Sequence, residues 1–594
     1  MMIHPQKVIQ EAVHETIKEL FDQEATDSQI QIQPTRKEFE GEFTVVVFPL
    51  LKISKNAPEK TGQLIGEKLK DQLPIDDFSV VKGFLNLKMK TSFWVDHLKL
   101  TYDADSYGFS PPNSKPLVMV EYSSPNTNKP LHLGHLRNIF LGHSVSEILK
   151  AYGHEVKRVQ IINDRGIHIC KSMVAYQRFG QGETPESSGL KGDHLIGKYY
   201  VLFNQELKKQ VNQMVEKGSS ADEAEAQAPL MQEARETLKR WENRDSEVYA
   251  LWEKLNGWVY KGFDQTYKTM GVHFDKLYFE SDTWSIGKEK AIKALDDGVF
   301  FKKDDGSVWV DLSEDGLDEK LILRKDGTAV YMTQDIGTAI IRYEEFPELS
   351  KMVYTVGNEQ EYHFKVLFLI LEKLGYEWAK DCHHLSYGMV ELPEGKMKSR
   401  EGTVVDADDL MNEMVANAES ITTELGKLDG LESSEKEELY TEIGLGALKY
   451  FLLRVDPRKN MLFDPKESID FNGHTGPFIQ YAHARIQSLL RNAENVVLDA
   501  HPHHDLSAYE RNLHMKILDF PEVIQHSAEE YNPALLANYL YELAKEFGSF
   551  YQNVPVLKAD TQSQKDYRIL LSAQVGRIIK SGMGLLGIQV PDRM

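Results

Sequence analysis

The chain has 594 residues, of which 41% are hydrophobic and 27% charged; this is typical of soluble globular proteins and argues against a wholly disordered chain. The formal net charge of -22 argues against broad, nonspecific nucleic-acid binding, although local basic patches could still hold a nucleic acid. The two cysteines, Cys170 and Cys382, argue against a disulfide framework and a Cys-rich zinc site. With no signal-like start and no long apolar run, a cytoplasmic protein without a membrane span is expected.

Residues 1–110 are predicted to form a small α+β unit. Apolar residues at helical spacing alternate there with runs of β-branched and aromatic residues. The expected elements are a helix over 8–21, a strand over 43–51, a helix over 62–73 and a strand over 80–89. The segment PPNSKP, at 111–116, is typical of a linker and ends the unit.

Residues 111–410 alternate strand and helix patterns, which predicts parallel βαβ units in a doubly wound sheet. A strand over 116–124 precedes a helix over 135–153 and a second strand over 154–164. Further strands or strand ends are expected over 309–312, 329–340, 351–360 and 383–392. Between them, about 183–245 is rich in Glu, Lys, Gln and Ala and is interpreted as an exposed helical insertion. Ligands of such sheets bind at the carboxyl ends of the strands.

Residues 411–594 carry almost only helical patterns. Apolar residues recur there at i, i+3 and i+4, which predicts a helical bundle. The patterned segments are 440–455, 476–497, 534–554 and 568–588.

The segment HLGH joins the first strand of the α/β region to its helix. A strand-to-helix turn presents backbone N–H groups to an anion, and Gly134 leaves room for a flat base against the backbone. His132 and His135, three positions apart, can donate hydrogen bonds to phosphate oxygens as charge develops. These features favour a nucleoside triphosphate; packing histidines and a zinc pair are the alternatives.

A second basic segment, EGKMKSREGTVV at 394–405, follows a strand-like run. Lys396, Lys398 and Arg400 lie within it between glycines, so the segment could close on a triphosphate and neutralise departing pyrophosphate. Alone it is a weak signal, because most clusters of Lys and Arg are solvated surface.

The basic segment at 394–405 resembles the KMSKS motif, and together with HLGH it resembles the class I aminoacyl-tRNA synthetases. Six longer segments resemble the arginyl-tRNA synthetases in particular. These segments are EYSSPNTNKPLHLGHLRN, IINDRGIHICKSM, AVYMTQDIGTA, VGNEQEYHF, GPFIQYAHAR and SGMGLLGIQVPDRM. The resemblance implies a Rossmann-like catalytic core over 111–410, an additional tRNA-contacting domain over 1–110 and an anticodon-binding bundle over 411–594. It also implies that arginine is activated by ATP with Mg²⁺ and transferred to the terminal 2′-hydroxyl of tRNA(Arg), by a monomer without a tightly bound cofactor or metal.

The resemblance also assigns roles to single residues. It implies ATP binding by His132, Gly134, His135, Met389, Val390 and Lys396. It implies arginine binding by Glu121, Ser124, Asn126, His135, Tyr331, Asp335 and Gln360. A guanidinium favours a planar, charge-assisted contact with a carboxylate, which suits Asp335; a helix N-cap is the alternative for that residue. Core packing is the alternative for Tyr331.

The KMSKS-like segment departs from the family pattern. The second lysine's place holds Ser399 in the frame that starts at Lys396. In the family, a lysine just before HLGH is thought to compensate, and Lys129 stands there; Lys398 or Arg400 could serve instead. The catalytic set implied by the resemblance is therefore His132, His135, Lys129, Lys396 and Lys398.

In the bundle, the resemblance implies tRNA contacts by Phe478, Tyr481, His483 and Met594. Aromatic side chains can stack on bases, but Phe478 and Tyr481 at i, i+3 on a helix are more often buried in a core than exposed. Three rival functions remain open at this point: a synthetase for another amino acid, a nucleotidyltransferase for a small metabolite, and a non-catalytic relative.

Overall fold

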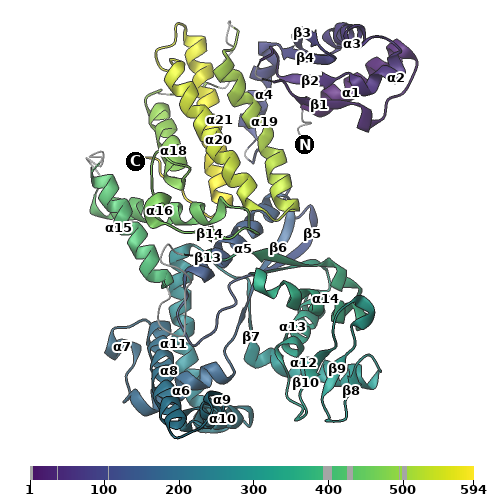
Figure 1. The fold of residues 1–594 in the computed structure, drawn as a ribbon. Coiled ribbons are helices and arrows are strands. Elements are labelled where there is room, and N and C mark those ends of the chain that lie inside the picture. Colours follow the sequence, from purple (N-terminus) through teal and green to yellow (C-terminus); the bar gives the residue numbers. More distant parts are fainter. Residues whose placement is uncertain are drawn as a thin grey trace.

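The computed structural model describes residues 5–36, 38–104, 106–391, 405–424, 432–493, 495–497 and 505–594. Figure 1 shows a small unit formed by the start of the chain, an α/β region below the middle, and a helical bundle formed by the end of the chain. None of the described helices combines the length and the apolar character needed to cross a membrane.

The N-terminal unit is an antiparallel four-stranded sheet in the order β1-β2-β4-β3, with helices packed around it. Its elements are α1 (Pro5–Phe21), β1 (Gln31–Pro34), β2 (Phe43–Val46), α2 (Leu51–Ser54), α3 (Pro58–Gln72), β3 (Ile75–Val81), β4 (Phe84–Met89) and α4 (Thr91–Asp103). The prediction of one strand over 80–89 was wrong. Lys82 and Gly83 both have positive φ, 49° and 76°, and so form the tight turn of a hairpin. The strand predicted over 43–51 ends at Val46.

The central sheet confirms the doubly wound α/β prediction, with five parallel strands in the order β12-β11-β5-β6-β7. Its strands are β5 (Lys115–Glu121), β6 (His154–Ile162), β7 (Lys276–Phe279), β11 (Leu349–Gly357) and β12 (Cys382–Tyr387). Alternate residues of β5 serve two cores because successive side chains of a strand point to opposite faces. Val118 and Val120 pack with α5 (Leu133–Ala151), whereas Leu117 and Met119 pack with the helices of the other face.

The remaining central elements cover the sheet and build out from it. They are α6 (Ile167–Phe179), α7 (Pro185–Ser188), α8 (Gly192–Glu216), α9 (Ala221–Gln227), α10 (Pro229–Glu242), α11 (Ser246–Met270), α12 (Glu280–Asp296), β8 (Phe301–Lys302), β9 (Val308–Val310), β10 (Lys320–Leu323), α13 (Tyr331–Glu345) and α14 (Glu361–Lys373). The insertion at about 183–245 is helical, as predicted. Figure 1 places α6–α11 and the α12–α14 group as two masses below the sheet.

The strand predicted over 329–340 was wrong, because this segment begins α13 at Tyr331. Met332, Ile336, Ile340 and Tyr343 are buried at helical spacing, and the Thr333 hydroxyl accepts the backbone N–H of Val330 in the first turn. The single strand predicted over 383–392 is two strands, β12 (Cys382–Tyr387) and β13 (Val390–Glu391). It divides at Gly388, where a Cβ would lie 2.5 Å from the backbone of Lys459.

The C-terminal part is helical, as predicted, apart from one short strand pair. Its elements are α15 (Ala407–Glu424), α16 (Ser433–Leu453), β14 (Met461–Leu462), α17 (Pro465–Ser468), α18 (Gly476–Arg491), α19 (Ala508–Glu529), α20 (Pro533–Asn553) and α21 (Gln562–Leu585). Strand β13 (Val390–Glu391) pairs in parallel with β14. This pair ties the chain that leaves the central sheet to the bundle.

Candidate active site

The order of the central strands places the topological switch point of the sheet between β5 and β11. These neighbours are followed by α5 and α14, which pack on opposite faces of the sheet. A doubly wound sheet binds its ligands at such a switch point, outside the carboxyl ends of the strands. Glu121 ends β5, Gln360 closely follows β11, and Glu280 directly follows β7, so all three lie at this edge of the sheet.

The HLGH segment forms the N-terminus of α5, as the sequence predicts. The backbone N–H of His132 donates to Nδ1 of His135 over 3.1 Å, and the two ring centroids are 3.8 Å apart. Because Nδ1 of His135 accepts this bond, a neutral His135 carries its proton on Nε2, which is left to donate to a ligand. A Cβ on Gly134 would lie 3.1 Å from the His132 ring, which favours glycine there.

Both imidazoles are neutral at physiological pH. Burial lowers the pKa of His132 to about 3, with a smaller contribution from the charge of Lys129. Burial also holds the pKa of His135 well below its ordinary value, assisted by His132 and Lys129. The pair therefore offers N–H donors rather than fixed charges. In the described part of the chain, no third His, Cys, Asp or Glu side chain joins them in a group that could hold a metal ion.

Arg137 of α5 binds the backbone at Gly388, a few residues before the KMSKS-like segment. Its buried guanidinium donates to the carbonyls of Gly388 at 2.5 Å, Lys459 at 2.8 Å and Pro457 at 3.2 Å. Met389, proposed from the sequence for ATP, is half exposed next to these contacts, and Val390 is buried in the β13–β14 pair. The sequence analysis missed Arg137, although it lies two residues after HLGH.

The loop between β5 and α5 is held in a strained conformation. Ser123 and Ser124 have positive φ values of 78° and 41°, which non-glycine residues adopt rarely. The side chain of Asn138 holds this turn: its oxygen accepts the Ser123 N–H, and its amide donates to the Thr355 carbonyl over 2.6 Å. Ser124 Oγ is buried without a hydrogen-bond partner among the described residues, and Asn126 is exposed. A polar ligand group could satisfy Ser124 there.

Glu121 pairs with a residue that the sequence analysis did not single out. Its carboxylate forms an ion pair with Arg342 of α13, and both side chains are buried. Arg342 also lies over the rings of Tyr278 and Tyr354, at 4.8 and 5.8 Å from their centroids. Leaving one member of such a buried pair uncompensated costs about 3–5 kcal/mol. The pair thus ties the end of β5 to the helix that bears Tyr331 and Asp335.

Tyr331 and Asp335 are one helical turn apart at the start of α13. Tyr331 is 72% exposed, so core packing does not explain it. Nε2 of His363, in the first turn of α14, donates to the Asp335 carboxylate over 2.6 Å. Gln360 is exposed three residues earlier. Asp335 is therefore no simple N-cap, and its carboxylate is oriented by a neighbouring helix.

Glu280 is a second carboxyl group near Asp335 that the sequence analysis missed. It is buried at the start of α12. Burial raises its pKa to about 7, and the charges of Asp164 and Asp335 add to this effect against the opposing charge of Arg165. The available signal was a carboxyl group directly after the short run KLYF, which forms β7 and was not predicted as a strand. A cation bound beside Glu280 and Asp335 would offset the cost of burying the Glu280 charge.

We expect Glu280→Gln to stabilise the ligand-free protein at pH 8 and to leave it almost unchanged at pH 4. The folded state holds the Glu280 proton up to about pH 7, whereas the unfolded state loses it near 4.5. Stability is therefore lost as pH rises through this window, by roughly 3 kcal/mol in total. Thermal unfolding at both pH values measures the effect. Glu289→Gln, an exposed position on the same helix, is the control, and a gain that does not depend on pH would contradict the assignment.

Lys129 lies half-buried directly before the HLGH turn. Burial lowers the pKa of its ammonium, and a Cβ on Gly197 of α8 would lie 3.7 Å from its Cα and 2.7 Å from the ring of Pro130. The first turns of α8, which belong to the helical insertion, thus pack against the residues before HLGH. This part of the insertion is not exposed as predicted. Lys396, Lys398 and Arg400 lie outside the described residues, and their roles stay predictions.

The residues predicted to contact tRNA lie on α18 and the C-terminal tail. Phe478 is half-buried against Tyr541, with 5.2 Å between ring centroids, and Arg485 lies 4.7 Å from the ring of Tyr481. His483 is fully buried, and its Nδ1 is 3.1 Å from the Pro591 carbonyl. Here His483 holds the tail instead of facing solvent. Met594 packs partly buried at the end of that tail.

The chain matches three family models in succession. They are the arginyl tRNA synthetase N terminal domain over residues 7–89, the catalytic domain of class I (R) tRNA synthetases over residues 103–464, and the DALR anticodon binding domain over residues 479–594.

Curated relatives and solved structures agree with these matches. The arginine–tRNA ligase of Bacteroides fragilis is 56% identical over 97% of this chain and 98% of its own length. That of Flavobacterium psychrophilum is 52% identical over 99% and 100% of the two chains. The structure of the Thermus thermophilus arginyl-tRNA synthetase matches with a TM-score of 0.78 at 26% identity, over the full length of both chains. The Plasmodium falciparum enzyme shares the fold, with a TM-score of 0.73 at 20% identity over both full chains.

Proposed function

The chain belongs to the arginyl-tRNA synthetases, the class I enzymes that ligate arginine to tRNA at the expense of ATP, and from this premise we propose how its residues divide the reaction. A carboxylate oxygen of arginine attacks the α-phosphorus of Mg²⁺-bound ATP, and pyrophosphate leaves as the bond to the β-phosphate breaks. The terminal 2′-hydroxyl of tRNA(Arg) then attacks the carbonyl of the adenylate, loses its proton, and releases AMP. Catalysis rests on positioning and electrostatics, without a covalent enzyme intermediate.

The start of α5 is the proposed ATP-binding element. Nε2–H of His135 and the ring of His132 donate to phosphate oxygens, and Gly134 lets the base lie against the backbone. Lys129, beside these rings, supplies the positive charge that the family pattern places in the KMSKS-like segment. Met389 and Val390 border the nucleotide from β13, and Lys396 and Lys398 act on the leaving pyrophosphate.

The proposed arginine pocket joins β5, α12 and α13. Glu121, held by Arg342, binds the substrate ammonium, while Ser124 and Asn126 bind its main-chain polar atoms. Tyr331, Asp335 and Gln360 surround the side chain, and Glu280 supplies a second carboxylate to the guanidinium. The observation that carries this assignment is the buried Glu280 beside Asp335, because two carboxyl groups match a planar cation with five N–H donors.

The bundle is the proposed anticodon-binding surface, with Phe478, Tyr481 and Met594 nearest the bases and His483 supporting the tail. We take 1–110, 111–410 and 411–594 as the tRNA-contacting, catalytic and anticodon-binding units of a cytoplasmic monomer. Light scattering of the purified protein checks the monomer.

The test of the function is charging of bulk tRNA by the purified protein with ATP and Mg²⁺. We expect labelled arginine to be incorporated, and labelled lysine, glutamine and cysteine to remain free. Charging with one of the other amino acids would overturn the arginine pocket, and a lack of all charging by folded protein would overturn the activity itself.

A further inference from the structure

A charged cluster joins three helices next to the HLGH turn. It lies between the first turns of α8 and α15 and the C-terminal end of α11. Its members are Lys191, Asp193, His194, Thr266, Asp406 and Asp408.

Lys191 is the central cation of this cluster. Its ammonium contacts the Asp408 carboxylate, donates to Thr266 Oγ1 over 2.5 Å, and lies 3.3 Å from Asp193. Asp193 is fully buried against Gly262, and its oxygens accept no hydrogen bond from the described residues. A buried carboxylate without hydrogen bonds needs a nearby positive charge, and Lys191 supplies it.

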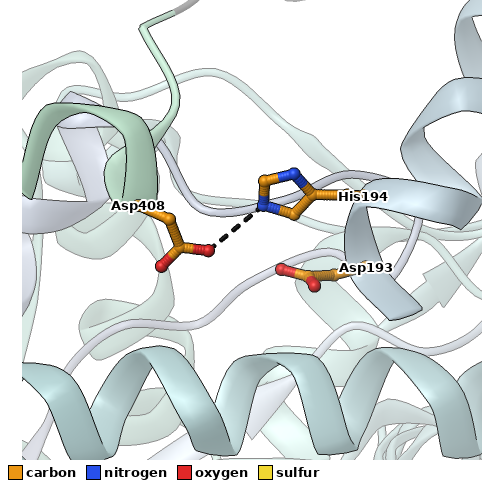
Figure 2. Close-up of side chains that lie close together, drawn as sticks. All are labelled: Asp193, His194 and Asp408. Atoms are coloured by element: carbon orange, nitrogen blue, oxygen red, sulfur yellow. Dashed lines mark hydrogen bonds and ion pairs between the residues drawn. The ribbon is translucent and has the colours of Figure 1, made fainter. Parts of the chain in front are cut away.

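His194 adds a second contact to the same turn of α15. Its Nε2 donates to Asp408 over 3.1 Å and lies 3.5 Å from Asp406, and Figure 2 shows the ring directed at Asp408 with Asp193 below it. Ligand atoms of Asp193, His194 and Asp408 lie within 4.8 Å of one another, a spacing that would also suit a metal ion. The Lys191 ammonium already contacts both carboxylates, so the cluster has its own cation.

The turn held by Lys191 is paired with the HLGH backbone on its other side. The Leu133 N–H donates to the Val405 carbonyl over 3.1 Å, and the Ala407 N–H donates to the Leu131 carbonyl over 3.0 Å. His132 and Asp406 thus form an antiparallel bridge. Asp406 also accepts the N–H groups of Asp408 and Asp409 and so caps α15.

We propose that Lys191 is a positioning residue for the ligase reaction: its ammonium fixes the Asp406–Asp408 turn and, through the bridge to His132, sets the backbone from which the imidazoles meet ATP. Without this charge, the carboxylates of Asp193, Asp406 and Asp408 keep only neutral donors and the His194 ring, and their mutual repulsion loosens the bridge. The inference rests on the proposed ATP-binding role of the HLGH turn. It assigns no substrate contact to Lys191 itself.

The test compares Lys191→Met and Lys191→Arg in the full-length enzyme. We expect the Met variant to raise KM for ATP and lower kcat, changing kcat/KM for ATP by about ten- to a hundredfold, while KM for arginine stays within about twofold. The Arg variant, which keeps the charge, should recover most of the loss. Lys198→Met is the control, since Lys198 lies on the same helix in an exposed ion pair with Glu183.

Several outcomes overturn the proposal. A folded Met variant with wild-type kinetics does so, as does an equal rise in KM for arginine and ATP, or an Arg variant no better than the Met variant. Equimolar transition metal in the dialysed wild-type protein would show that an ion, and not Lys191, holds the carboxylates.

If the Met variant does not fold, Asp408→Asn removes the same ion pair with less change, and the same shift in KM for ATP is expected. If His135→Asn also leaves the kinetics with ATP unchanged, the proposed ATP site fails; if it has a large effect and Lys191→Met has none, the Lys191 inference alone fails.

Discussion

Asparagine at position 335 is expected to lower kcat/KM for arginine by about 10³-fold or more, while KM for ATP stays within about twofold. The substitution keeps the shape of the side chain, and the asparagine oxygen can still accept the His363 N–H that orients Asp335. What it removes is the negative charge that we propose to face the guanidinium of the substrate. Because a guanidinium desolvated in the pocket loses a charge-assisted, planar contact, the loss should fall on arginine alone. Charging kinetics and calorimetric arginine binding measure it.

Asp304→Asn is the matched control for this variant. Asp304 is exposed in the turn between β8 and β9 of the same region, so its substitution should leave both KM values unchanged. An Asp335→Asn enzyme with normal kcat/KM for arginine would remove Asp335 from the pocket and leave it as a partner of His363. A combined loss of arginine and ATP affinity would point to misfolding of α13.

The second large effect is expected from His135→Asn, which should lower kcat by about 10²- to 10³-fold with little change in KM for arginine. Asparagine can accept the backbone N–H of His132 through its oxygen, so the first turn of α5 should remain capped. It cannot replace the donor at Nε2, which is the group proposed to meet the phosphate. The variant thus keeps the hydrogen bond to the His132 backbone and removes the proposed hydrogen bond to phosphate.

The pH profile gives this prediction a second measurement. Because burial holds the pKa of His135 well below its ordinary value, the ring stays neutral from about pH 6 to 8 and its titration should not shape the wild-type rate there. His526→Asn, at an exposed position of α19, is the control. A His135→Asn enzyme with wild-type kcat would contradict the proposed phosphate contact, provided that its melting temperature is unchanged.

Local sequence signals were sufficient where a feature depends on neighbours along the chain. The alternation of buried strand and amphipathic helix predicted the parallel sheet, and the HLGH segment was placed correctly at a helix start. The same signals failed at 80–89 and 329–340. A strand run with Lys82 and Gly83 inside it hides a hairpin turn, and the β-like composition at 329–340 outweighed its helical spacing.

The residues missed in the site are those whose role comes from distant partners. Arg137 binds carbonyls more than 250 residues away, Arg342 meets Glu121 across the sheet, and Glu280 gains its raised pKa from burial beside Asp335. None of these partners could be predicted from residue spacing in the sequence. They lie on elements that are far apart along the chain and become neighbours only when the chain folds. His483 shows the converse: it lies in a family-typical segment, and the fold turns it inward to the tail.

By itself, the sequence determined the class of fold, the βαβ units and the helical bundle, which follow from periodicity, a property of neighbouring residues. The family and its substrates came from the resemblance that its joint set of motifs carries. The tertiary structure decided which charges are paired, which are buried, and which face a ligand. Pairing and burial depend on the packing of segments far apart in the chain, and they set the neutral imidazoles at α5, the raised pKa of Glu280 and the position of Lys191 between α8 and α15.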